Sequence, residues 1–272
     1  MALESNVMEL ISPAASEIPG TMSASLSRLS TWRDEDADGA FDASIDALAA
    51  SLDVDAAVNL TLERVDMDNP SACYWGVSGT SHGRALSARL ILPSGEGECP
   101  LVLMFHDADR SVRGWHHMTR FAGVGMAVLA LEQRGDRFED LLLDAIALKT
   151  AVRAVSVLDH SSISTWGEGL GGALALGVAA LSGSGIDRCA VANPIAPALS
   201  EGRGSLIHLA SRVCCPTLVG TGLMDSPKAV QDQFAMVNRM SCPCRHVIYP
   251  KHGHERINAF EDRVLAFLLS TE

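Results

Sequence analysis

From Pro100 onward, short continuous apolar runs alternate with longer segments whose apolar residues recur at helical spacing. Pro100–Phe105 (PLVLMF) is the first of these runs and is typical of a strand buried on both faces. Further strands are predicted at Met126–Leu131, Ile163–Trp166, Cys189–Ala192, Pro216–Gly220 and Cys244–Tyr249. Helices are predicted at Trp115–Val124, Leu141–Leu158, Leu170–Leu181, Gly204–Arg212, Lys228–Met240 and Glu255–Leu269. This alternation indicates βαβ units and a parallel sheet.

The chain before Pro100 has a different pattern, because its apolar stretches are interleaved with polar residues. Strands predicted at Val58–Val65, Ala72–Val77 and Leu86–Leu92 indicate an antiparallel meander with one solvated face. A short helix is predicted at Phe41–Ser51, and the Ser- and Ala-rich residues 1–40 are predicted to be a loosely attached arm. We therefore predict one α/β domain over residues 41–272, with a mostly parallel twisted sheet, antiparallel N-terminal strands and helices on both faces.

Composition excludes several classes of function. The chain has 272 residues, 47% of them hydrophobic, and 21 basic against 33 acidic residues give a net charge of −12. An acidic balance argues against a nucleic-acid partner. No apolar run approaches the roughly 18 residues of a membrane span, and Met1–Gly20 lacks the basic start of a secretory signal. We expect no membrane partner, and a cytoplasmic protein whose seven cysteines are free thiols.

The most informative segment is Thr165–Gly172 (TWGEGLGG), between a predicted strand and a predicted helix. One interpretation is a dinucleotide fingerprint, since Gly167, Gly169 and Gly172 satisfy G-x-G-x-x-G. Such a site needs an acid at the end of the next strand. Asp187 lies at about the right distance of 20 residues, but it precedes that strand and would lie at the opposite edge of the sheet.

The other interpretation is a nucleophile elbow, in which small residues flank the nucleophile on a sharp strand-to-helix turn. Gly167 and Gly171 take the two small positions, and Gly172 allows close packing of the helix. Gly169 then occupies the nucleophile position. Glycine relieves about 1–3 kcal/mol of backbone strain there, but it has no side chain and abolishes conventional acyl-enzyme chemistry.

Two other candidate sites are weaker. Glu168 is a possible substitute nucleophile. Making it the elbow residue would put the bulky Trp166 and Leu170 at the two positions that require small residues, which is sterically unfavourable. A metal site can be drawn from thiols and imidazoles whose spacing matches no finger or ribbon pattern: Cys242, Cys244, His246, His252 and His254. Buried thiols are favoured over ligands, and we expect neither a metal nor a cofactor.

Four further motifs accompany the elbow: Phe105-His106 followed by Gly114-Trp115-His116; Arg134-Gly135; Pro216–Asp225 (PTLVGTGLMD); and Tyr249-Pro250 with Gly253-His254-Glu255. In this order they resemble the acetyl xylan esterase / cephalosporin C deacetylase family of α/β-hydrolases. That family's elbow reads G-x-S-Q-G-G, so Gly169 replaces Ser and Leu170 replaces Gln. The resemblance covers about Trp32 to the C-terminus and implies the α/β-hydrolase fold.

The resemblance also implies a catalytic triad. Asp225 is its acid and His254 its general base, in the chain order nucleophile, acid, histidine. Asp225 could equally cap the helix after Ser226-Pro227, and both roles are compatible. His254 could otherwise be an exposed loop histidine beside His252.

Supporting groups follow from the same resemblance. The backbone N–H groups of Ala108 and Leu170 would form the oxyanion hole, each donor being worth about 2.7–4 kcal/mol in the transition state. His106, Arg134 and Glu168 would support the site. Arg134 would brace the strand-end loops through bidentate bonds, or else form an exposed ion pair.

The departures from the family pattern bear on activity. The oxyanion-loop Gly is Asp107 here, which would place negative charge beside the oxyanion hole unless it lies in a solvated turn. The segments after Gly135 and between Pro194 and Ser205 are short, which leaves the pocket and the oligomeric state open, with a homo-oligomer as one option.

The expected function is that of a carboxylic-ester hydrolase acting on acetylated carbohydrate or small acetyl esters, impaired or inactive because of Gly169. The expected partner is a small-molecule ester or an acetylated sugar. The alternative is a non-catalytic binding or regulatory pseudoenzyme, and dinucleotide binding is the least favoured option. We expect very weak hydrolysis of p-nitrophenyl acetate, which should rise in Gly169→Ser.

Overall fold

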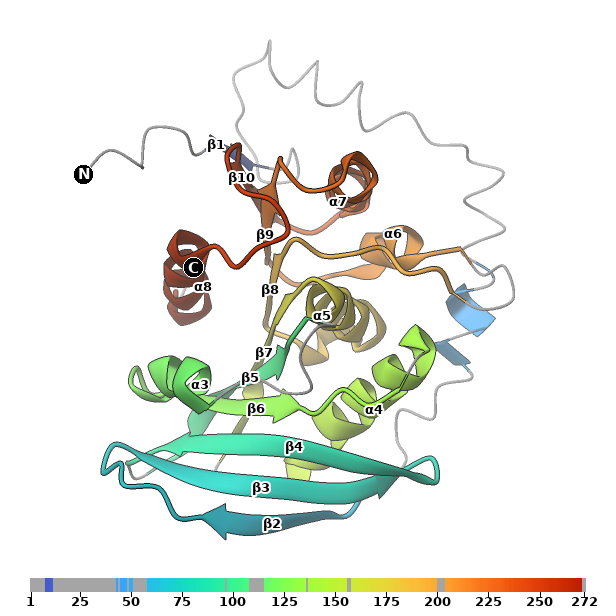
Figure 1. Ribbon diagram of the computed structural model, residues 1–272. Helices are drawn as coiled ribbons and strands as arrows, with labels where there is room; N and C mark the ends of the chain where they lie inside the picture. The colour runs from blue at the N-terminus through green and yellow to red at the C-terminus, as the bar shows by residue number, and fades with distance from the viewer. Residues whose placement is uncertain are drawn as a thin grey trace, which may run out of the picture.

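A computed structural model describes residues 8–11, 43, 45–47, 49–50, 58–95, 97–107, 115–135, 137–155, 158–199 and 204–270. Their strands form one ten-stranded sheet in the order β1-β10-β9-β8-β7-β5-β6-β4-β3-β2 (Figure 1). The six central strands run parallel: β5 (Cys99–Phe105), β6 (Ala127–Leu131), β7 (Leu158–Glu168), β8 (Arg188–Ala192), β9 (Thr217–Gly222) and β10 (Cys244–Tyr249). Antiparallel strands flank them: β2 (Leu60–Val65), β3 (Ala72–Ser81) and β4 (Arg84–Pro93) at one side, and β1 (Met8–Ile11) at the other.

Helices cover both faces of this sheet, as predicted. Helices α4 (Phe138–Ala151), α5 (Leu170–Leu181), α6 (Leu206–Leu209) and α7 (Pro227–Arg239) lie on one face, and α3 (Trp115–Ala122) and α8 (Asn258–Leu269) on the other (Figure 1). Each face has its own apolar core, one containing the buried side chains of α4 and α5 and the other those of α3 and α8. The central strands β5 and β6 are buried on both faces, which is why their sequences, CPLVLMF and AVLAL, are continuous apolar runs.

The helices and strands predicted after residue 58 are present, although most differ from the prediction at one or both ends. The bounds of α5 and β10 coincide with the prediction, whereas the helix predicted at Leu141–Leu158 ends at Ala151. A short 3-10 turn follows it, and Leu158 begins β7. The apolar spacing that extended the predicted helix comes from residues of this turn and strand that also face the core.

The N-terminal predictions fall largely outside the described residues. Within the predicted arm, Met8–Ile11 forms β1, which pairs antiparallel with β10, and the boundary at residue 40 stays a prediction. Of the helix predicted at Phe41–Ser51, the described positions are helical and Ile45 is fully buried. None of the helices within the described ranges is long and apolar enough to cross a bilayer.

The carboxyl ends of five neighbouring strands meet at one edge of the sheet. Asp107 follows β5, Gly169 follows β7, Asn193 follows β8, Asp225 follows β9, and His254 follows β10. Because parallel strands end at the same edge, residues far apart in the sequence come together there, where ligands bind in sheets of this kind.

Candidate active site

The strand-to-helix turn at Gly169 has the backbone of a nucleophile elbow. Gly169 lies between β7 and α5 with φ 53° and ψ −117°, a left-handed conformation that favours glycine. Its N–H donates to the Ala192 carbonyl at 2.9 Å. A Cβ on Gly171 would lie 2.5 Å from the His106 carbonyl oxygen, so α5 packs directly against the end of β5. The sharp turn is therefore present although the nucleophile is not.

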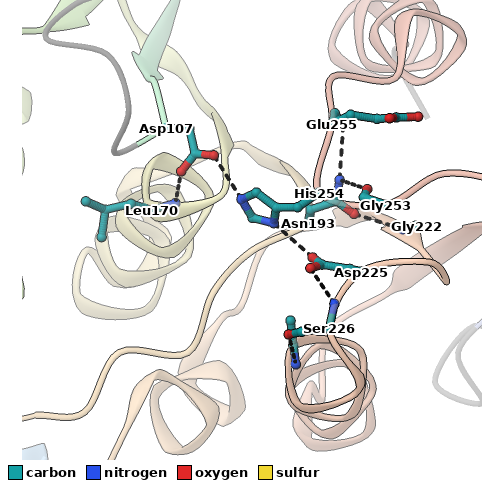
Figure 2. Close-up of polar contacts among 10 residues, drawn as sticks. Asp107, Leu170, Asn193, Gly222, Asp225, Ser226, Gly253, His254 and Glu255 are labelled. Carbon is teal, nitrogen blue, oxygen red and sulfur yellow. Dashed lines mark hydrogen bonds and ion pairs between the residues drawn. The ribbon is translucent and has the colours of Figure 1, made fainter.

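The carboxylate of Asp107 fills the space beside Gly169. A Cβ added to Gly169 would collide with all three atoms of that carboxyl group. One of its oxygens, Oδ1, accepts the N–H of Leu170 at 3.0 Å (Figure 2). The N–H expected to serve in the oxyanion hole is thus bound to an anion that belongs to the protein itself.

The imidazole of His254 lies between two carboxylates (Figure 2). Its Nδ1 is 2.8 Å from Asp225 Oδ2, and its Nε2 is 2.9 Å from Asp107 Oδ2. The hydrogen bond to Asp107, followed by that to Asp225, outweighs partial burial and raises the pKa of His254 to about 9. At neutral pH both ring nitrogens carry protons and donate, so His254 already holds the proton that a general base must accept.

The loop after β9 holds the Asp225 side chain in place, and its contacts distinguish between the two roles expected of Asp225, helix cap and partner of His254. Asp225 Oδ1 accepts the N–H of Ser226 at 2.6 Å, and Oδ2 accepts from His254. The N-cap of α7 is Ser226, whose Oγ accepts the N–H of Ala229. The capping role considered for Asp225 belongs to its neighbour, and the Asp225 side chain orients the imidazole.

Asn193 was missed by the sequence analysis and ties the site together. It is buried with φ 44°, and its Oδ1 accepts the N–H of Gly222 at 2.8 Å. Its Nδ2 donates to the carbonyls of Gly253 at 3.1 Å and Glu255 at 3.3 Å (Figure 2). One side chain therefore joins the loop of Asp225 to the loop of His254. The signal in the sequence is Asn193-Pro194, a turn dipeptide directly after a strand.

The remaining predicted residues lie at different distances from this centre. Ala108 falls outside the described residues. His106 is fully buried, and its Nδ1 donates to the Asp107 carbonyl at 2.8 Å, which shapes the loop that presents Asp107. Glu168 is buried at the end of β7 next to Gly169. Arg134 is exposed and pairs with Glu132 at 2.5 Å, so the structure gives it the ion pair rather than the bracing role.

The residues considered for a dinucleotide site or a metal site do not come together in the part of the chain that the structure describes. Asp187 lies at the start of β8, at the end of the sheet opposite Gly169, so it cannot hold a ribose bound at the glycine turn. Across the described residues, no three His, Cys, Asp or Glu side chains form a metal-binding group. His246 Nε2 is instead bonded to Thr221 Oγ1 at 2.9 Å. Burial raises the pKa of the Cys215 thiol to about 12 and also raises that of Cys244.

Solved structures of esterases share this fold. Acetyl xylan esterase 1 from Thermoanaerobacterium sp. JW/SL YS485 superposes with a TM-score of 0.74 at 19% identity, covering 84% of this chain and 92% of that one. The acetyl xylan esterase from Paenibacillus sp. R4 gives 0.72 at 21% identity, covering 89% and 98%. A cold-adapted esterase from an Arctic intertidal metagenomic library gives 0.63 at 16% identity, covering 76% and 97%.

The sequence itself matches a family described as acetyl xylan esterase, over residues 21–140 and 205–271. The matched segments include Asp107, Asp225 and His254, and they span more than half of the chain. The unmatched residues 141–204 include β7, Gly169 and α5. The chain thus belongs to the acetyl xylan esterase family of carboxylic-ester hydrolases and has the α/β-hydrolase fold.

Proposed function

We propose that this chain accepts acetyl esters of carbohydrates or other small alcohols at the His254 centre and is impaired in cleaving them by acyl transfer. One observation carries the proposal: the Asp107 carboxylate occupies the space of the nucleophile side chain and is bonded to both Leu170 N–H and His254. Nothing else at the turn supplies a hydroxyl, because the elbow residue is Gly169.

Three steps of acyl transfer are affected. No Oγ is present to attack the carbonyl carbon, and the Leu170 N–H that would stabilise the oxyanion is bound to Asp107. His254 is protonated at neutral pH because of its two carboxylate neighbours, so it cannot accept a proton from water. Attack by Asp107 itself would give a tetrahedral intermediate, from which the carboxylate leaves more readily than a sugar alkoxide, so the ester would reform instead of a mixed anhydride.

The test compares the hydrolysis of p-nitrophenyl acetate by four proteins: wild type, Gly169→Ser, Asp107→Gly and the double variant. We expect the wild-type rate of hydrolysis to be close to the rate without protein. Gly169→Ser alone should stay low, because its Cβ collides with Asp107; this revises the expectation from the sequence, in which that single change restores activity. Asp107→Gly alone should stay low because it has no nucleophile.

The double variant frees the oxyanion donor and His254 and supplies the hydroxyl, so its rate should exceed that of wild type by about 10³-fold or more. Adding His254→Ala should abolish this gain while leaving the fold intact by circular dichroism. Wild-type turnover as fast as that of the double variant would sink the proposal.

A binding role without turnover is the second candidate, because Asp225 and His254 keep their hydrogen bond at 2.8 Å although the nucleophile is absent. Acetylated xylose should then raise the melting temperature of the wild type, and non-acetylated xylose should not. Equal effects of the two sugars, or none, would leave impaired hydrolysis as the only candidate.

A further inference from the structure

We propose that Asp107 is a nucleophile in its own right, and that this site hydrolyses alkyl electrophiles whose leaving group departs as a stable anion, such as primary alkyl halides. This reaction breaks a bond at tetrahedral carbon rather than at an acyl carbon. It therefore does not depend on the ester function proposed above, and either proposal can fail alone.

The two oxygens of Asp107 have the partners that such a reaction needs. Oδ1 accepts the N–H of Leu170 at 3.0 Å, and Oδ2 lies 2.9 Å from His254 Nε2. A carboxylate oxygen has two lone pairs, so it can accept a hydrogen bond and still attack carbon. The Asp107 side chain is 24% exposed, which leaves it within reach of a small substrate. Carboxylates serve as covalent nucleophiles in several enzyme classes.

In the first step, Oδ2 of Asp107 attacks the carbon that bears the leaving group. The new C–O bond forms an alkyl ester at Asp107, the C–X bond breaks, and both of its electrons leave with the halide. The ester is neutral, so Asp107 no longer holds the proton on His254. The pKa of His254, which Asp107 raises more than any other group, falls, and the imidazolium releases its proton to solvent.

In the second step, the neutral His254 takes a proton from water as the water oxygen attacks Cγ of the ester. The charge that develops on Oδ1 is stabilised by the N–H of Leu170, which already donates to that atom. Collapse expels the alkyl oxygen, which leaves as the alcohol with the second proton of the water. Asp107 returns as a carboxylate beside protonated His254, and the sum is alkyl halide plus water giving alcohol, halide and a proton.

The loop that carries Asp225 also has exposed apolar side chains. Leu223 and Met224, which immediately precede Asp225, are exposed although both are apolar. Asp225 itself keeps its hydrogen bond to Nδ1, which orients Nε2 toward Asp107 in both steps. The same loop thus offers apolar surface for a hydrocarbon chain and the carboxylate that positions the base.

The experiment uses 1-bromobutane with the full chain and measures bromide release. Wild type should release bromide above the rate without protein. Asp107→Asn keeps the side-chain shape and an acceptor for Leu170 N–H but cannot attack, so its release should fall to background. Asp187→Asn, which removes a carboxylate at the other end of the sheet, is the matched control and should match wild type.

Two mass measurements identify the nucleophile. His254→Gln lacks the base of the second step, so the peptide containing Asp107 should gain one butyl group, and Asp107→Asn in that background should prevent it. In a single turnover of wild type in H₂¹⁸O, the Asp107 peptide should gain ¹⁸O. Alkylation of the exposed Cys214 is separated by peptide mapping, and the raised pKa of the buried Cys215 suppresses its reaction.

The experiment has three possible outcomes. Bromide release with ¹⁸O in the Asp107 peptide supports the proposal, and the second measurement stands even if His254→Gln fails to fold. Bromide release without ¹⁸O in that peptide overturns it in favour of direct attack by water. No bromide release from folded wild type also overturns it, and leaves the ester experiment unaffected.

Discussion

The two halves of the site differ in how well they match the family. The loops after β9 and β10 hold Asp225 and His254 at hydrogen-bonding distance and lie within the family match of residues 205–271. The turn after β7 lies within the unmatched residues 141–204, and its key position is Gly169. The hydrogen-bonded pair Asp225–His254 and the sharp backbone turn are therefore both present, although Gly169 has no side chain to act as a nucleophile.

The contact between the halves explains how the pair stays ordered. Asp107, from the loop after β5, bonds to the N-terminus of α5 on one side and to His254 on the other. It supplies from a third loop the hydrogen-bond partner that the elbow side chain would provide. The space beside Gly169 therefore holds a carboxylate instead of a hydroxyl, and His254 has a charged partner there.

The largest effect is expected at Asp225, in the half of the site that lies within the family match. In the Gly169→Ser/Asp107→Gly background, Asp225→Asn should lower kcat on p-nitrophenyl acetate by about 10³-fold, back to near the wild-type rate, because the imidazole loses the partner that orients it. In the wild-type background the same substitution should change the rate little. If both backgrounds respond equally, Asp225 acts on the fold alone.

Asn193 should matter for stability, because it joins the loop after β9 to the loop after β10. Asn193→Ala should lower the free energy of unfolding in urea by about 3 kcal/mol, since it leaves one buried N–H and two carbonyls without this partner. Asn193→Gly loses the same bonds but tolerates the positive φ, so it should lose about 1 kcal/mol less. Equal losses would show that backbone conformation contributes nothing there.

The hydrogen bond between Asp107 and His254 should make the stability of the fold depend on pH. His254 has a folded-state pKa of about 9 against an ordinary 6.5, so its stabilising effect is complete below 6.5 and is lost as the pH rises through 9. The denaturation midpoint should fall across this range, and less steeply in Asp107→Asn. Identical slopes in the two proteins would mean that Asp107 does not hold the proton on His254.

Arg134 lies outside both halves and should have the smallest effect. Its exposed ion pair with Glu132 predicts that Arg134→Ala changes the free energy of unfolding by less than about 0.5 kcal/mol. It should also leave the activity of the double variant unchanged. A larger loss on either measurement would restore the bracing role.

The fold was largely predictable because a parallel sheet buried on both faces has a distinct sequence pattern. The elements that carry Gly169, Asp225 and His254 follow from that pattern and from the motif order. The position of Asp107 did not, because it depends on the space that opens when the elbow residue loses its side chain. The role of Asn193 was not predicted for a similar reason, because its partners are backbone groups of loops far away in the sequence.

The positive φ at Gly169 has a consequence for how such sites are recognised. The turn is held by the close packing of Gly171 against the end of β5 and by the Gly169 N–H bond to Ala192, neither of which involves a nucleophile. These contacts hold the turn whether or not the chain cleaves esters. The shape of the turn and the reaction performed there can therefore evolve independently, and a change of nucleophile requires no change of scaffold.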